Sequence, residues 1–180
     1  MPKKKQDLKK INQKEAYLNI SFKILTVFYT LSLISISWAK DAPTTCSIRS
    51  YDGHYLTAVD GGGRTTEVLT TDKTKRNALE IFTLINFGKI FGIKTRSGNY
   101  LSAQGGGGQI TDVIHSDKTK WLDWEKFKLI PLGNEWYAIQ TFTGNYLTAV
   151  DGGGRTTDVI RSDATVIGKW EMWYFFCWTT

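Results

Sequence analysis

Two loops of identical sequence contain the residues whose types and spacing best suit binding chemistry. In each loop, an aspartate and an arginine stand four positions apart within the segment DGGGRTT, as Asp60 and Arg64 and again as Asp151 and Arg155. A carboxylate accepts hydrogen bonds and a guanidinium donates several, so the pair suits the vicinal hydroxyl groups of a sugar. We therefore interpret these four residues as ligand-binding.

A third, looser copy of the loop offers amides in place of the charged pair. Gln104 and Gln109 flank four consecutive glycines, and His115 lies three residues after Asp112. Amides both donate and accept hydrogen bonds. We interpret Gln104, Gln109 and His115 as the ligand-binding residues of this copy.

An aromatic ring would complete a sugar site, and Trp121 is the candidate. Its equivalents in the other copies are Arg76 and Ile167, so this position does not belong to a shared apolar core. Trp124 and Trp170 share their position with a leucine, which favours packing for both.

The glycines have a second, structural interpretation, which the sequence leaves open. Consecutive glycines allow positive φ angles or a close approach to a neighbouring strand. One glutamate per copy would accept hydrogen bonds from the loop N–H groups. These glutamates are Glu80, Glu125 and Glu171.

The pattern argues against catalysis, metal binding and cofactors. Carboxylates repeated by symmetry have similar surroundings, whereas two-carboxylate catalysis needs an unequal pair. The two histidines, His54 and His115, stand at non-equivalent positions, and no Cys/His cluster has zinc spacing. We expect a protein that is not an enzyme and that uses no metal and no cofactor.

These loops belong to a threefold internal repeat. The segment YLTAVDGGGRTT begins at Tyr55 and at Tyr146, and YLSAQGGGGQIT begins at Tyr100, so the steps are 45 and 46 residues. Each repeat also contains a Gly turn and β-forming stretches such as FGIKT and WYAIQT. We predict an all-β chain with four strands per repeat, over residues 46–88, 89–133 and 134–180.

Twelve strands in three four-strand units predict a β-trefoil, because no unit can bury its apolar face alone. Five sets of apolar residues recur at matched positions and would meet around a common axis. They are Ile48/Ile93/Ile139, Leu56/Leu101/Leu147, Ala58/Ala103/Ala149, Phe82/Phe127/Trp173 and Leu84/Leu129/Phe175.

The motif GNYLTA, followed by a Gly-rich loop and closed by WExF, resembles the fascin-like β-trefoils. The third repeat is similar to single trefoil modules attached to secreted bacterial polysaccharide-degrading enzymes. The resemblance covers about residues 46–180. It implies a β-trefoil and, through fascin, an actin-binding or other protein-interaction role. Fascin joins four trefoils and this chain has one, and the Gln-x-Trp signature of ricin-type trefoils is missing here.

Residues 1–39 differ from the repeats. A basic stretch precedes the apolar run 24–39, and Ser37 and Ala39 fit a cleavage site before Lys40. The run is shorter than the roughly 20 residues that span a bilayer. We predict a signal peptide over 1–39 and a secreted or periplasmic trefoil over 40–180. The alternative is a protein anchored in the membrane through 24–39.

The positive charge of the chain belongs to this leader. Residues 1–39 carry a net charge of +5, whereas residues 40–180 contain 16 basic and 15 acidic residues. Nucleic-acid binding normally needs a basic patch. We therefore expect no nucleic-acid partner.

Cys46 and Cys177 are the only cysteines, and we predict a disulfide between them. Cys46 lies two residues before Ile48 and Cys177 two after Phe175, so both face the core side of their strands. The first and last strands of a trefoil are neighbours, and export would supply an oxidising compartment. The alternative is two buried free cysteines.

Two functions remain. An exported, lectin-like module would bind a polysaccharide or other glycan at up to three loops, with a gain from avidity. A protein-interaction module would bind actin or another protein, and export counts against actin.

Overall fold

The computed structural model describes residues 43–178, and this part is an all-β domain of twelve strands in three repeats. The first repeat contains β1 (Thr44–Ser50), β2 (Tyr55–Ala58), β3 (Leu69–Lys73) and β4 (Ile81–Phe87). The second contains β5 (Ile90–Lys94), β6 (Tyr100–Ala103), β7 (Ile114–Lys118) and β8 (Lys128–Gly133). The third contains β9 (Trp136–Gln140), β10 (Tyr146–Ala149), β11 (Ile160–Ala164) and β12 (Met172–Trp178).

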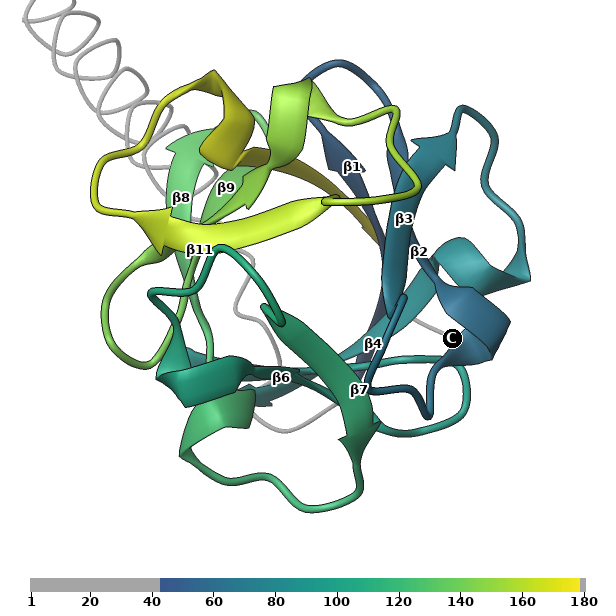
Figure 1. The fold of residues 1–180 in the computed structure, drawn as a ribbon, viewed down its shortest axis with the longest axis vertical. Helices are drawn as coiled ribbons and strands as arrows, with labels where there is room; N and C mark the ends of the chain where they lie inside the picture. The colour runs from purple at the N-terminus through teal and green to yellow at the C-terminus, as the bar shows by residue number, and fades with distance from the viewer. Residues whose placement is uncertain (1–42, 179–180) are drawn as a thin grey trace, which may run out of the picture. The chain divides into compact units, whose positions relative to one another are not determined.

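The first and last strands of each repeat close a six-stranded barrel. Antiparallel pairing runs from β1 to β4, β5, β8, β9 and β12 and returns to β1, with the β5–β8 step made by the Phe91–Phe127 bridge. The other strands pair as β2–β3, β6–β7 and β10–β11. These three hairpins surround a central axis (Figure 1). This arrangement confirms the predicted β-trefoil.

The predicted apolar sets form the core. Fourteen of their fifteen side chains are buried, and the partly buried Leu129 packs against them. Each set draws one side chain from each repeat, so the core requires all three repeats.

An acidic turn residue precedes the third strand of each repeat. In each repeat this residue has a positive φ, between 46° and 49°. The chain therefore turns at Glu67, Asp112 and Asp158, and the strand starts two residues later.

Short 3-10 turns precede the last strand of each repeat, and they correct the predicted role of the glutamates. These turns are η2 (Ala78–Glu80), η4 (Asp123–Glu125) and η6 (Lys169–Glu171). Their buried glutamates accept hydrogen bonds from the N–H groups of Asn77, Leu122 and Gly168, not from the Gly-rich loops. A carboxylate suits this place because the first N–H groups of a helical turn have no partner within the turn.

A disulfide joins the two ends of the barrel. Cys46 in β1 lies directly opposite Cys177 in β12, and their sulfur atoms are bonded. The predicted bond is therefore present, and no free cysteine remains in residues 43–178.

Within the same residues, no helix has the length and apolar character needed to cross a bilayer. The predicted signal peptide and the alternative anchor lie outside the described residues.

Candidate functional site

Each Gly-rich loop connects the second and third strands of its repeat and packs against the following repeat. Each begins with a 3-10 turn, namely η1 (Val59–Gly61), η3 (Gln104–Gly106) and η5 (Val150–Gly152). The glycine after the turn has a φ of 106° to 119°. A Cβ atom on it would lie closer than 3.0 Å to a hydroxyl of the following repeat. The glycine–hydroxyl pairs are Gly62–Thr95, Gly107–Thr141 and Gly153–Ser50.

The next two residues of each loop pair with a strand of the following repeat. The Gly63 N–H donates to the Ser116 carbonyl, and the Ser116 N–H donates to the Arg64 carbonyl, both at 2.8 Å. Equivalent bonds join Gly108 and Gln109 to Ser162, and Gly154 and Arg155 to Thr71. The three loops thus form a closed ring of contacts, which confirms the structural interpretation of the glycines.

The arginines of the first and third loops hold their own loops closed. Arg64 donates to the Asp60 carboxylate at 2.5 Å and to the Thr66 carbonyl at 3.1 Å. Arg155 makes the same contacts with Asp151 and with the Thr157 carbonyl. The structure therefore brings each predicted Asp–Arg pair together at the surface, with part of its hydrogen-bonding capacity used inside the loop.

The middle loop is built differently because Gly105 replaces the aspartate. Gln109 places its side-chain amide beside Gly105. Gln104 turns back to hydrogen bond with Ser102. His115 lies on β7, with its Nε2 atom 2.7 Å from the Asp112 carboxylate.

Trp121 packs at the junction of the first and second repeats. Its ring stacks on Phe87 with the centroids 3.9 Å apart, and the Lys126 ammonium lies 5.3 Å from its centroid. The equivalent Arg76 covers Trp178 in the same way. One face of the Trp121 indole is therefore already occupied.

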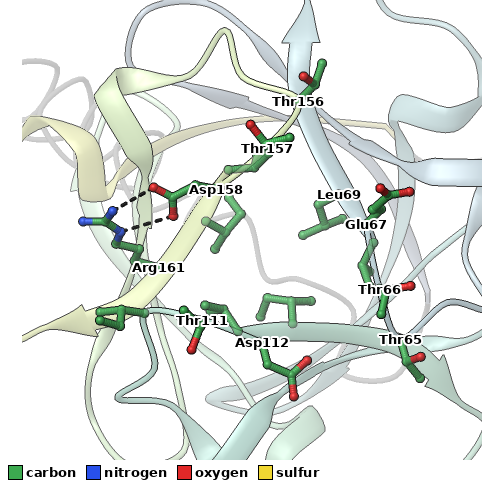
Figure 2. A pocket seen from close by; sticks show the side chains of 16 residues that line it. Thr65, Thr66, Glu67, Leu69, Thr111, Asp112, Thr156, Thr157, Asp158 and Arg161 are labelled. Carbon is green, nitrogen blue, oxygen red and sulfur yellow. Dashed lines mark hydrogen bonds and ion pairs between the residues drawn. The ribbon is translucent and has the colours of Figure 1, made fainter.

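A depression of about 640 Å³ lies on the threefold axis, between the three hairpins (Figure 2). All three repeats line it. Apolar side chains at the start of β3, β7 and β11 belong to it, and threonines and acidic residues from each repeat complete the lining. The acidic residues are Glu67, Asp112 and Asp158. None of the eight predicted ligand-binding residues lines it, although Arg64, His115 and Arg155 contact these acids.

Arg161 is the basic residue among those that line the depression, and it pairs with Asp158. Asp158 accepts two hydrogen bonds from Arg161, which lower the pKa of that carboxyl from its usual value. No aromatic ring lines the depression. It offers hydroxyl and carboxylate groups above apolar side chains, without a surface for stacking.

Exposed aromatic rings lie beside the Gly-rich loops, and these were not predicted. The rings of Trp124 and Phe142 both approach Gly106, each with an atom 3.5 Å from the position of a Cβ atom there. Their exposed fractions are 44% and 54%. The residues at the equivalent positions of the third loop, Trp170 and Tyr51, are exposed as well, but the atoms nearest to Gly152 there are those of the Asp52 side chain.

Trp124 was predicted to be a packing residue because it shares its position with Leu79. The structure shows that the side chain at this position packs against the loop and is also exposed to solvent. Leu79 covers Gly61 as Trp124 covers Gly106, and each leaves its outer side open to solvent. The sequence signal that could have identified Trp124 was a tryptophan at a position where the first repeat packs with a leucine, Leu79.

Known structures with the same fold include proteins that act on or bind carbohydrates. The chain is similar to ThreeFoil, a designed threefold-symmetric protein, with 12% identity and a TM-score of 0.64 over 73% of this chain and 96% of that one. A lectin of Polyporus squamosus, bound to Neu5Aca2-6Galb1-4GlcNAc, matches at 14% identity and a TM-score of 0.57, over 77% of this chain and 50% of that chain.

A third similar structure is 1,3Gal43A, an exo-beta-1,3-galactanase from Clostridium thermocellum. It matches at 15% identity with a TM-score of 0.59, over 73% of this chain and 30% of that enzyme. No family model and no curated protein matches this chain. These likenesses establish a β-trefoil protein, and the fascin-like family stays a prediction.

Proposed function

We propose that this protein is a non-catalytic carbohydrate-binding module that binds glycans beside its Gly-rich loops. The observation that carries the proposal is the exposed ring pair Trp124 and Phe142 on either side of Gly106. Two large apolar side chains left in solvent next to one loop mark a binding surface more often than a packing defect.

The chemistry beside the rings suits a sugar. A sugar ring presents C–H groups on its faces and hydroxyl groups at its edges, so it needs an apolar surface together with hydrogen-bonding groups. The Gln109 amide lies over the same loop and both donates and accepts hydrogen bonds. The third repeat has exposed rings, Trp170 and Tyr51, at the equivalent positions, and its loop carries the Asp151–Arg155 pair.

Two further observations support the proposal. The lectin and galactanase likenesses show that this fold occurs in proteins that bind or act on carbohydrates. The Cys46–Cys177 disulfide suits the oxidising compartment that export would supply. The export signal itself is the predicted leader 1–39, and a protein partner such as actin remains the alternative to a glycan.

The ring pair is tested with matched truncations of one position in two repeats. Trp124→Ala is expected to weaken binding to the best glycan on an array by about tenfold, because one stacking surface is lost. Leu79→Ala, which truncates the equivalent residue of a loop without a ring, should leave the affinity within about twofold of wild type. Isothermal titration calorimetry measures both. Equal affinities for wild type and Trp124→Ala would refute a glycan site at this loop.

The loop arginines allow a second test. The double variant Arg64→Ala/Arg155→Ala is expected to bind the polysaccharide more weakly, while its melting temperature changes little. Exposed ion pairs contribute about 0–1 kcal/mol each to stability, so the fold should survive their loss. Binding curves and thermal melts of the same samples give both values. Unchanged binding by the folded variant would remove these arginines from the site.

A further inference from the structure

A row of aromatic side chains crosses the outer wall of the barrel, where the first strand β1 pairs with the last strand β12. In the strand register, Trp136 of β9 lies opposite Tyr174 of β12, Tyr174 opposite Arg49 of β1, and Arg49 opposite Tyr55 of β2. The rings of Trp136 and Tyr174 make an edge contact at 5.4 Å. Four strands thus bring three rings and one guanidinium into a continuous line.

Strand β12 extends this row into a face. Its side chains alternate between the two sides of the sheet, and Trp173 and Phe175 are buried in the core. Tyr174, Phe176 and Trp178 therefore share the outer side, and Phe176 is 48% exposed. Alternate residues of a strand are about 6.8 Å apart, so these three rings cover roughly 14 Å, enough for more than one sugar ring.

Two arginines lie against these rings. The guanidinium carbon of Arg49 is 5.2 Å from the Tyr174 centroid and 5.9 Å from that of Tyr55. That of Arg76 is 4.6 Å from the Trp178 centroid and 5.4 Å from that of Phe176. We call Arg49, Arg76, Tyr174, Phe176 and Trp178 the β12 face.

Neither arginine has a carboxylate partner among residues 43–178, unlike Arg64, Arg155 and Arg161. The Nε atom of Arg49 is also buried there without a hydrogen-bond partner. A guanidinium that stacks on a ring uses its flat face and keeps N–H donors at its edge. The β12 face therefore combines apolar rings with two arginines that form no ion pair within residues 43–178 and can still donate. The acid that borders the face is Glu135, whose carboxylate accepts a hydrogen bond from the Tyr174 hydroxyl at 2.5 Å.

The trefoil fold does not require this face. The residues equivalent to Tyr174 in the other repeats are Thr83 and Lys128, and those equivalent to Arg49 are Lys94 and Gln140. The barrel core is built from inward-facing side chains in all three repeats. Tyr174 and Arg49 are therefore additions to one side of a symmetric scaffold, whereas the Arg76–Trp178 contact has a counterpart in the packing of Trp121 on Phe87.

We propose that the β12 face is a second binding site, for an acidic polysaccharide. The rings would stack on sugar faces, while Arg49 and Arg76 would pair with carboxylate or sulfate groups along the polymer. Residues 40–180 carry 16 basic against 15 acidic residues, so the attraction is local to this face, and the domain lacks the excess of positive charge on which nucleic-acid binding rests. The proposal rests on the proposed carbohydrate binding but uses residues distant in sequence from the ring pair Trp124 and Phe142.

The test compares one polymer with and without its charge. Full-length protein is titrated with polygalacturonate, with the same polymer after complete methyl esterification, with heparin, and with a single-stranded oligo(dT). We expect tighter binding to polygalacturonate or heparin than to the esterified polymer. Arg49→Gln and Arg76→Gln should each weaken the charged interaction by roughly tenfold, as expected for a charge-assisted hydrogen bond. Lys128→Gln, which removes an exposed cation from strand β8 of the barrel, is the control for charge alone.

The outcomes separate the two proposals. Equal affinity for charged and esterified polymers, no binding to either anionic polysaccharide, or no difference between Arg49→Gln/Arg76→Gln and Lys128→Gln would overturn the β12 face as a site. Tighter binding to oligo(dT) than to both polysaccharides would assign the face to nucleic acid instead. A failure here with a persistent effect of Trp124→Ala on glycan affinity would leave the proposed function in place. Thermal melts confirm that each variant is folded.

Discussion

Replacement of both cysteines, Cys46→Ala with Cys177→Ala, is expected to lower the melting temperature by roughly 10 °C or more. The disulfide closes a loop with a sequence separation of 131 residues. In the chain-entropy model a loop of this length contributes about 4–5 kcal/mol, by restricting the unfolded chain. For a domain of this size, each kcal/mol corresponds to a few degrees of melting temperature. Differential scanning calorimetry of wild type and double variant measures the change.

The control is the wild-type protein unfolded and refolded with its thiols reduced, which should approach the melting temperature of the double variant. A difference of less than about 2 °C between variant and oxidised wild type would contradict a stabilising bond. Free thiols in protein purified from an exporting host would contradict the bond itself.

Gly107→Ala is expected to destabilise the fold by about 3 kcal/mol, the second large effect. The residue has a φ of 119°, and an added Cβ atom would overlap the Thr141 hydroxyl of the next repeat. The backbone conformation, with a ψ of −175° beside that φ, costs about 1–3 kcal/mol for a residue with a Cβ atom, and the overlap adds about 1–3 kcal/mol. Urea denaturation followed by tryptophan fluorescence measures the loss of unfolding free energy.

Gly98→Ala separates strain from contact. Gly98 has a φ of 85°, but nothing lies within 4 Å of an added Cβ atom there. This variant should therefore lose only the unfolding free energy that a positive φ costs a residue with a Cβ atom, about 1 kcal/mol. If both variants lost the same stability, the contact between the Gly-rich loop and the next repeat would not stabilise the ring of repeats.

The fold could be predicted from the sequence because the same pattern of apolar residues occurs in all three repeats. Ile48, Ile93 and Ile139 recur at matched positions, so a common axis is the arrangement that buries all three. The disulfide followed from the same reasoning, since the first and last strands of a closed barrel are neighbours. The partners of the glutamates were harder to predict, because Glu80 accepts its hydrogen bond from the Asn77 N–H of its own 3-10 turn and not from the Gly-rich loop.

The site was less predictable because its contacts join different repeats. The partner of Gly62 is Thr95, and nothing local in DGGGRTT indicates that hydroxyl. Phe142 comes to lie beside Gly106 only through the docking of one repeat on the next. The β12 face likewise depends on strand register, since Arg49 and Tyr174 are distant in the sequence and adjacent in the barrel. Residue types alone identified the loops, and the pairing of repeats determined which rings lie beside them.

The most direct test of the carbohydrate-binding proposal is a glycan-array screen of the full-length protein, run beside an actin co-sedimentation assay. We predict binding to a defined set of glycans, loss of that signal for Trp124→Ala, and no sedimentation with filamentous actin. Binding to actin with no glycan signal would contradict the proposal and assign this trefoil to protein interaction.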